Sequence, residues 1–180
     1  MEVLHGAPIE IDWGSGVYAK IIATNAYGDS VESLSGNGAV IITNPDAPVN
    51  LVEDASKRTA TTLGLQWQDG ADNGGSPVTS YTLEMTTVAD NLFTVLQSGI
   101  TQQQFTVADL LYGTSYKFRL QAVNAFDPGA YSAELTLLCA TFPVAPAAPV
   151  TSVSGNKLVV NWDAPDNRGS PITAYKVLIR

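Results

Sequence analysis

The chain has 180 residues and a net charge of −8, with 45% hydrophobic but only 14% charged residues. This apolar content excludes an acidic disordered tail, and nine basic against seventeen acidic side chains argue against a nucleic-acid groove, which needs a basic surface. One His and one Cys leave little material for an enzyme, a disulfide framework or a zinc site.

The chain repeats itself with the period of one small domain. Asn-Ala-Tyr at 25–27 returns as Asn-Ala-Phe at 124–126, and Ser-Pro-Val-Thr-Ser-Tyr at 76–81 returns as Ser-Pro-Ile-Thr-Ala-Tyr at 170–175. The offset shrinks from 99 residues (124 − 25) to 94 (175 − 81), as small differences in loop length would produce.

Residues 1–44 predict the last strands of a domain. Val17, Ala19, Ile21 and Ala23 alternate with other residues, so they share one face of a strand. Trp13, which precedes them, is a candidate to supply apolar bulk beside the small Ala19. His5 has no carboxylate motif around it and is expected to be solvated.

Residues 45–143 predict a complete unit of short strands. Turn clusters at 69–77, 112–114 and 127–129 separate the apolar alternations, a pattern typical of an antiparallel sandwich. Cys139 ends an apolar run and is expected to be a small buried hydrophobe. The alternating inward residues are Leu63, Leu65 and Trp67, then Tyr81, Leu83 and Met85, then Tyr116, Phe118, Leu120 and Ala122.

Residues 144–180 repeat only the first part of this unit. Leu158, Val160 and Trp162 stand where Leu63, Leu65 and Trp67 stand in the complete unit. The second apolar alternation is Tyr175, Val177 and Ile179. These residues predict the first three strands of a further domain.

In this order and at these spacings, the residues resemble the fibronectin type III family. The strand ending in Trp67 is similar to the second strand of that family, and residues 75–78 with Tyr81 resemble the approach to its third. Residues 110–116 resemble its tyrosine corner, in which a Tyr hydroxyl bonds to an earlier backbone group. In the N-terminal part, Val17 replaces the corner Tyr.

The resemblance implies an all-β fold of tandem antiparallel β-sandwiches of the fibronectin type III, immunoglobulin-like type. It divides the chain into three parts. These are the C-terminal part of a domain at 1–44, a complete domain at 45–143, and the N-terminal part of a further domain at 144–180.

A partial sandwich leaves an apolar face without an opposing sheet. We therefore expect the end domains to be completed either by continuation of the chain or by a neighbouring copy. Joining the last part to the first would omit only the equivalents of residues 87–99, about one edge strand. The inter-unit completion faces are Val17, Ala19, Ile21, Ala23, Leu158, Val160, Trp162, Tyr175, Val177 and Ile179.

An acidic loop recurs in both of the later units. Asp69, Asp72 and Asn73 return as Asp163, Asp166 and Asn167. Clustered oxygens of this kind can ligate Ca²⁺, but Asp and Asn beside Gly also cap turns through their own backbone. Because Arg168 adds a positive charge to the second loop, we expect turn capping, with no metal, cofactor or catalytic residue.

The expected function is a non-enzymatic structural or adhesive repeat segment that forms a rod or filament. The expected partner is a protein, namely further copies of this chain bound head to tail. Neither nucleic acid nor a membrane span is expected in this segment. The expected location is extracellular or at the cell surface. Two alternatives remain open: a cytoplasmic scaffold repeat of a giant protein, which the unpaired Cys permits, and a spacer or carbohydrate-binding accessory module of a secreted enzyme.

Overall fold

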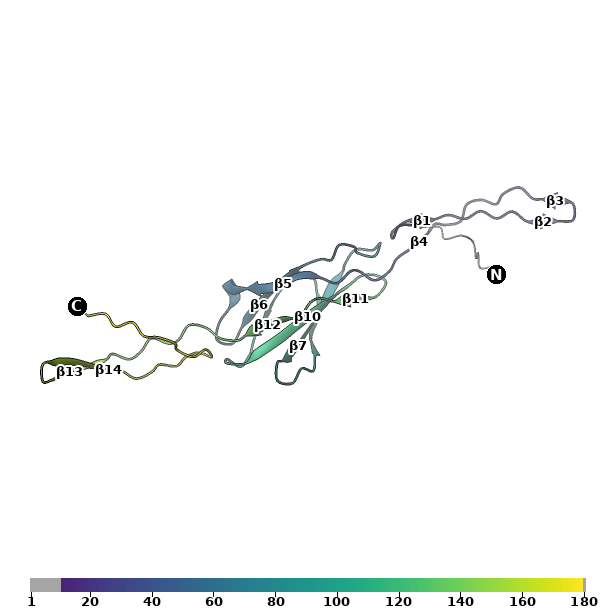
Figure 1. Cartoon of the computed structure of the whole chain (residues 1–180). Helices are drawn as coiled ribbons and strands as arrows, with labels where there is room; N and C mark the ends of the chain where they lie inside the picture. Colours follow the sequence, from purple (N-terminus) through teal and green to yellow (C-terminus); the bar gives the residue numbers. More distant parts are fainter. Residues whose placement is uncertain (1–10, 180) are drawn as a thin grey trace.

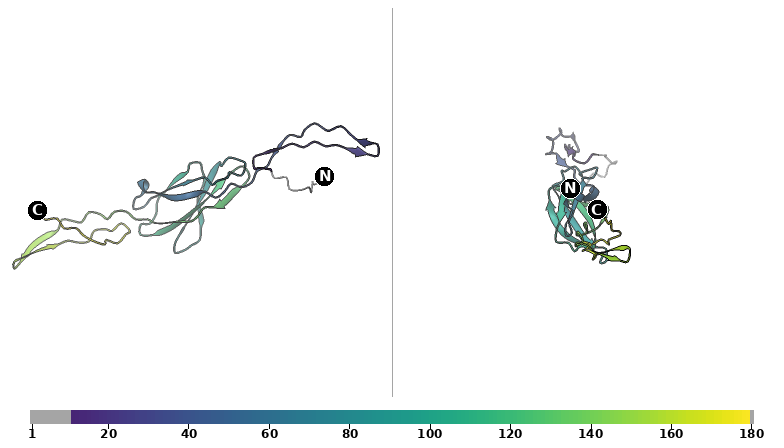
Figure 2. Two further views of the ribbon diagram at one scale, coloured as in Figure 1. Left: turned by 45° about the horizontal axis from the view of Figure 1, so that its top comes forward. Right: turned by 90° about the vertical axis from the view of Figure 1, so that its left-hand side faces the viewer.

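The protein is elongated, with one β-sandwich at its centre and an extension of paired strands at each end (Figure 1, Figure 2). The computed structural model describes residues 11–179. His5 therefore lies outside the described residues. Between residues 11 and 179 the regular elements are β-strands and one short 3-10 helix, η1 (Ala55–Lys57), so the expected all-β fold is confirmed. Within this span, no helix has the length and apolarity needed to cross a membrane.

The central sandwich consists of two antiparallel sheets. The strand order of the first sheet is β5 (Val49–Asp54), β6 (Leu63–Gln68) and β9 (Gln104–Val107). The second sheet runs from β8 (Thr94–Ile100) through β7 (Ser80–Thr87) to β10 (Ser115–Val123), and its far edge is shared by β11 (Pro128–Tyr131) and β12 (Leu135–Leu138).

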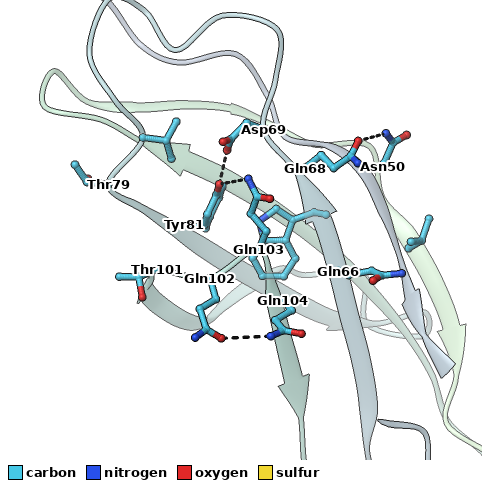
Figure 3. A pocket seen from close by; sticks show the side chains of 13 residues that line it. Asn50, Gln66, Gln68, Asp69, Thr79, Tyr81, Thr101, Gln102, Gln103 and Gln104 are labelled. Carbon is cyan, nitrogen blue, oxygen red and sulfur yellow. Dashed lines mark hydrogen bonds between the residues drawn. The ribbon is translucent and has the colours of Figure 1, made fainter. Parts of the chain in front are cut away.

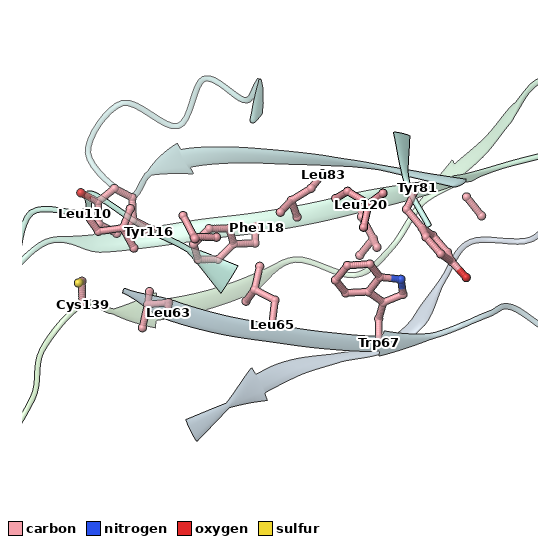
Figure 4. Close-up of a cluster of buried hydrophobic side chains, with 13 residues drawn as sticks. Leu63, Leu65, Trp67, Tyr81, Leu83, Leu110, Tyr116, Phe118, Leu120 and Cys139 are labelled. Carbon is pink, nitrogen blue, oxygen red and sulfur yellow. The ribbon is translucent and has the colours of Figure 1, made fainter. Parts of the chain in front are cut away.

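The core lies between these sheets and contains the alternating residues that the sequence predicts, except Met85, which is only partly buried (Figure 4). Ile100, Val107 and Leu110 also belong to the core, although the predicted alternations do not include them. Leu65 on β6 and Leu120 on β10 are fully buried because strand alternation points both inward. The rings of Trp67 and Tyr81 meet edge to face, with centroids 5.3 Å apart at 74°. Such an aromatic pair adds about 0.5–1.5 kcal/mol to the burial of its area.

The turn expected at 127–129 is shorter than predicted. Strand β11 already begins at Pro128, which pairs with Val123 across a register shift in β10. Proline lacks a backbone N–H but is tolerated at the first residue of an edge strand. The sequence prediction was wrong at Pro128 and Gly129. It treated the Pro-Gly pair as a turn signal, whereas the pair begins an edge strand of the second sheet.

The tyrosine corner implied by the resemblance is present. The ring of Tyr116 is buried, and its hydroxyl oxygen accepts a hydrogen bond of 3.0 Å from the backbone N–H of Leu111. This bond ties the turn before β10 to the strand that follows it.

Replacing Tyr116 with phenylalanine is expected to lower the free energy of unfolding by about 1 kcal/mol, because one hydrogen bond is lost while the ring stays buried. The measurement is urea denaturation followed by tryptophan fluorescence. Tyr112→Phe is the matched control, since Tyr112 is 54% exposed. Equal urea midpoints for the two variants would contradict a stabilising role of the corner.

The N-terminal extension repeats the far edge of the second sheet. In the central sandwich, Ser132 N–H donates to the carbonyl of Leu120 (2.8 Å), and its hydroxyl accepts from Leu120 N–H (3.2 Å). Ser33 makes the same two bonds to Ile21, at 2.9 and 3.0 Å. Its strands are β1 (Gly16–Val17), which pairs with β4 (Ala39–Val40), and β2 (Thr24–Asn25), which pairs with β3 (Gly28–Asp29).

The C-terminal extension repeats the first two strands of the sandwich. The prediction of a third strand through Tyr175, Val177 and Ile179 was wrong, because residues 162–179 form no strand where the partner that β10 gives to β7 is missing from residues 11–179. Strands β13 (Val150–Ser154) and β14 (Lys157–Asn161) form an antiparallel hairpin. Beyond it, Trp162 and Tyr175 meet edge to face with centroids 5.4 Å apart at 62°. This aromatic pair has nearly the geometry of Trp67 and Tyr81, although the C-terminal extension lacks an opposing sheet within residues 11–179.

Candidate interdomain joints

Each extension meets the central sandwich at a joint made of three chain segments (Figure 1). The N-terminal joint consists of residues 13–14, 41–46 and 72–75. The C-terminal joint consists of Gly113 and residues 139–144 and 166–169. In both, the unit upstream supplies a turn and the strand that leads out of it, and the unit downstream supplies the acidic loop.

The two joints have the same backbone hydrogen bonds. Thr43 N–H donates to Gly74 O over 2.9 Å, and at the other joint Thr141 N–H donates to Arg168 O over 3.1 Å. These bonds connect the outgoing strand to the acidic loop. Asp46 N–H donates to Asp72 O (2.8 Å), as Val144 N–H donates to Asp166 O (2.9 Å) at the other joint. Gly14 N–H donates to Ile41 O (2.8 Å), as Gly113 N–H donates to Cys139 O (2.8 Å).

A close contact between glycines lies at the centre of each joint. Gly75 has a φ of +76°, and a Cβ atom there would lie 2.1 Å from the nitrogen of Gly14. Gly169 has a φ of +90°, and its Cβ would lie 2.4 Å from the nitrogen of Gly113. Both the left-handed backbone and the close approach therefore require glycine.

The acidic loops use their side chains to cap turns. Asp72 Oδ1 accepts from Gly74 N–H (2.8 Å), and Asn73 Oδ1 accepts from Gly75 N–H (3.0 Å). Asp69 does not cap this turn; its Oδ1 accepts a hydrogen bond from the hydroxyl of Tyr81. The second loop repeats the caps: Asp166 accepts from Arg168 N–H (2.8 Å) and Asn167 from Gly169 N–H (3.0 Å). The side-chain oxygens of Asp72, Asn73, Asp166 and Asn167 thus accept hydrogen bonds from the backbone of their own loops, as the turn-capping interpretation expects.

Asn124 holds the N-terminal joint from inside the sandwich. Its side chain is buried, and Nδ2 donates to the carbonyls of Thr43 (2.7 Å) and Asn73 (2.8 Å). Its Oδ1 accepts from the N–H groups of Phe126 (2.9 Å) and Asp127 (3.2 Å). The carboxamide therefore ties the linker, the acidic loop and the loop after β10 together. The sequence marks this residue only through the recurring Asn-Ala-aromatic triplet.

The linker between the N-terminal extension and β5 packs along the sandwich. Asn44 Nδ2 donates to the carbonyl of Pro128 (2.6 Å), and Pro45 and Pro48 are buried. A Cβ at Gly129 would lie 2.1 Å from Pro45 O, so linker and strand β11 touch through their backbones. This linker is therefore fixed to the domain that follows it.

Arg58 supports the C-terminal joint. Its Nη1 donates to the carbonyls of Leu138 and Ala140, both at 2.8 Å, and its guanidinium forms an ion pair with Glu53 at 2.6 Å. Between those carbonyls, Cys139 is fully buried and its thiol donates to Ala60 O (3.2 Å). Burial raises the pKa of this thiol, so Cys139 behaves as the small hydrophobe that the sequence predicts.

A polar groove of about 810 Å³ lies over the first sheet near the N-terminal joint (Figure 3). Beside Asp69, the hydroxyl of Tyr81 accepts from Gln103 Nε2 (3.2 Å). Burial and the hydrogen bond to Asp69 raise the pKa of Tyr81, which keeps the phenol neutral. The carboxamides that line the groove are Asn50, Gln66, Gln68, Gln102, Gln103 and Gln104. They offer a hydrogen-bonding surface beside the carboxylate of Asp69.

The residues singled out for inter-unit completion lie in the two extensions, at opposite ends of the molecule (Figure 1). Ile21 is 72% exposed although its counterpart Leu120 is fully buried, and Val177 is 50% exposed although its counterpart Leu83 is fully buried. The structure does not bring the two groups together within one chain. Of the others, Val17, Ala19, Ala23, Leu158, Trp162, Tyr175 and Ile179 are exposed and Val160 is half-buried.

Comparison with known protein families gives the central sandwich a definite assignment. The family model described as fibronectin type III domain matches residues 46–137. The chain belongs to the fibronectin type III family. The sequence resemblance is thereby confirmed, and the two joints are contacts between a fibronectin type III domain and the strand pieces that flank it.

Relatives of the chain are much longer proteins. Homo sapiens Fibronectin type-III domain-containing protein 3A is 31% identical over 120 residues, which is 66% of this chain and 10% of that protein. The Gallus gallus protein of the same name is 32% identical over 149 residues, 81% of this chain and 12% of that protein. Drosophila melanogaster Titin is 26% identical over 196 residues, covering 92% of this chain and 1% of that protein. The chain thus spans about a tenth of the length of Fibronectin type-III domain-containing protein 3A and about a hundredth of that of Titin.

Solved structures share the fold. A crystal structure of titin domains superposes with a TM-score of 0.56 at 21% sequence identity, covering 72% of this chain and 42% of that chain. The twitchin kinase region from C. elegans superposes with a TM-score of 0.50 at 22% identity, covering 54% of this chain and 17% of that chain. The chain is a fibronectin type III repeat segment that resembles the repeats of such proteins.

Proposed function

We propose that this fibronectin type III segment is a non-enzymatic structural part of a tandem rod, which holds successive domains at a fixed spacing and orientation. The observation that carries the proposal is the repetition of one joint, with the same backbone bonds and the same glycine contact, at both ends of the sandwich. A joint of constant form rotates each unit by the same amount relative to the last, and an array built this way is regular and extended.

The contacts of the joints support stiffness. Two backbone hydrogen bonds connect the outgoing strand to the acidic loop at each joint. Each contributes about 0.5–1.5 kcal/mol net. Domains joined by a free linker move relative to one another by default. The bonded linker of this protein removes that freedom.

The exposed apolar faces of the extensions support completion by further fibronectin type III strands. Continuation of the chain or a neighbouring copy would supply these strands and so lengthen the rod into a filament. The partner class is accordingly protein, and nucleic acid is excluded from the proposal by the excess of acidic side chains. An extracellular or cell-surface location suits an adhesive rod of this kind.

A scaffold repeat inside the cytoplasm is the second candidate. It is favoured by the alignment of Drosophila melanogaster Titin over 92% of this chain. The unpaired Cys139 is also compatible with a reducing compartment. Both candidates require the same stiff joints and differ in the proteins that surround the rod.

Spin-label distance measurements test the proposed stiffness within one chain. Ile22→Cys with Leu92→Cys spans the N-terminal joint, and Leu92→Cys with Lys157→Cys spans the C-terminal joint; native Cys139 is buried and is not labelled. We expect one narrow distance distribution across each joint. A label pair inside the N-terminal extension, Ile22→Cys with Leu34→Cys, reports whether that extension is folded. A broad distribution across the joint with a narrow one inside the extension would contradict the rod.

A further inference from the structure

We infer that the polar groove over the first sheet binds a neutral carbohydrate, whose hydroxyl groups bond to the carboxamides of the groove and to the indole of Trp67. The residues that line the groove lie between Asn50 and Gln104, all within the central sandwich. The site is therefore complete without the strands that flank this sandwich in the chain. The inference goes beyond the proposed rod, because it gives the central domain a ligand of its own.

The indole N–H of Trp67 is a buried donor without an acceptor. Only 3% of Trp67 is exposed, and among residues 11–179 its Nε1 has no hydrogen-bond partner. Nearly all buried N–H groups in proteins are paired, so an unpaired one requires an explanation. Trp67 lines the groove, and its Nε1 lies on the edge of the ring that faces Tyr81 (Figure 4). A ligand oxygen at this end of the groove supplies the missing acceptor.

The side chains of the groove suit uncharged hydroxyl groups. A carboxamide both donates and accepts hydrogen bonds, as a sugar hydroxyl does, so one side chain can bond to two neighbouring hydroxyls of a sugar ring. Of the described residues that line the groove, only Asp69 is charged, and its carboxylate accepts hydrogen bonds from hydroxyl groups. The lining includes no Lys or Arg, which are the residues that recognise phosphate and sulfate. The groove therefore favours a neutral sugar over an anionic ligand.

Hydrogen bonds within the groove hold several of its polar side chains in place (Figure 3). Asn50 Nδ2 donates to Gln68 Oε1 over 2.7 Å, and Gln103 Nε2 donates to the hydroxyl of Tyr81 over 3.2 Å. Each of these bonds uses one polar atom of a carboxamide and leaves the other to a ligand. Side chains that are ordered before binding lose less conformational entropy when a ligand arrives.

The position of the groove favours a carbohydrate over an extended peptide. The groove lies over β6, which pairs with β5 on one side and with β9 on the other. The backbone groups of β6 are therefore used within the sheet, whereas a peptide that adds to a sheet binds the free backbone of an edge strand. Side chains remain as the recognising groups, and Val52, which is 44% exposed, offers apolar surface to the C–H face of a sugar ring. The volume of about 810 Å³ is within the usual range of ligand sites.

NMR titration of the full chain with neutral oligosaccharides tests the site. The probes are maltohexaose, cellohexaose, laminarihexaose, xylohexaose and mannohexaose. The chain has three tryptophans, so two-dimensional proton–nitrogen spectra contain three indole signals, which Trp13→Phe and Trp162→Phe assign. We expect at least one probe to shift the Trp67 indole signal saturably and to leave the signals of Trp13 and Trp162 in place.

The double variant Gln66→Ala with Gln104→Ala tests the carboxamides. These two residues lie opposite one another across β6 and β9, and both are exposed. The affinity for the active probe is expected to fall at least about tenfold, with an unchanged urea midpoint. Gln97→Ala is the matched control, because Gln97 is exposed on β8 and does not line the groove. Equal affinities in the double variant and in the control overturn the inference.

Three outcomes of the titration also overturn it. The first is that no probe shifts the Trp67 signal at about 10 mM, where even millimolar binding would be visible. The second is an equal shift of all three indole signals. The third is that a short neutral peptide of Ser and Gln shifts the Trp67 signal and no oligosaccharide does, which would assign the groove to a peptide. The spin-label distances across the joints are measured without a ligand, so a failure of binding is distinguishable from a failure of the proposed rod.

Discussion

The Gly75→Ala protein is expected to lose its N-terminal joint while the central sandwich stays folded. A Cβ at this position would lie 2.1 Å from the nitrogen of Gly14, and neither backbone can yield without breaking the bond between Thr43 and Gly74. We expect amide hydrogen exchange at Thr43 and Asp46 to accelerate at least about tenfold. The distance distribution between labels on Ile22 and Leu92 should broaden in parallel.

Gly99→Ala is the control for this substitution. Gly99 has a similar φ of +70°, but a Cβ there meets nothing within 4 Å. Both variants therefore share the strain of a left-handed alanine, about 1–2 kcal/mol, and only Gly75→Ala adds the collision. If Thr43 exchanges at the same rate in both variants, the glycine contact does not hold the joint.

The Leu83→Ala substitution is expected to cost about 2–5 kcal/mol of unfolding free energy, because Leu83 is fully buried and its removal leaves a cavity. That loss is a large part of the 5–15 kcal/mol typical of a domain. Urea denaturation followed by circular dichroism measures it. The matched variant is Val177→Ala, which occupies the equivalent position in the C-terminal extension but is 50% exposed.

We expect Val177→Ala to leave the main unfolding transition within about 0.5 kcal/mol of the parent. The reason is that the extension contributes nothing to the core of the central sandwich, whose cluster is confined to residues of that sandwich. Comparable losses of unfolding free energy in both variants would mean that the extension and the sandwich unfold as one cooperative unit. That result would contradict the division of the chain into separate units.

The structure of the joints explains the role of the acidic loops. Clustered Asp and Asn residues are chemically suited to calcium, and the glycines beside them led the sequence analysis to predict turn capping instead. The sequence does not show what the capped turn contacts. The side chains cap the turn that lets Gly75 approach Gly14. In the second loop Arg168 replaces Gly74 with a φ of +50°, and the same bonds persist.

The sequence by itself determined the fold and its repetition. Alternation of Leu63, Leu65 and Trp67 is a local property, because successive residues of a strand point to opposite faces, and it predicts the buried face without knowledge of its partner. The repeated motifs likewise placed a complete domain at residues 45–143, and the fibronectin type III model matches residues 46–137. The lone Cys139 was correctly expected to be buried because it follows an apolar alternation.

Only the tertiary structure decided how the units meet. The contact between Gly14 and Gly75 joins residues 61 positions apart (75 − 14), and that between Asn124 and Thr43 joins residues 81 positions apart. Neither pair of residues belongs to a common periodicity or motif. Each contact involves the backbone of at least one partner, and a backbone contact produces no side-chain pattern in the sequence. The strands of this protein follow from local alternation, whereas its joints depend on the path of the backbone in space.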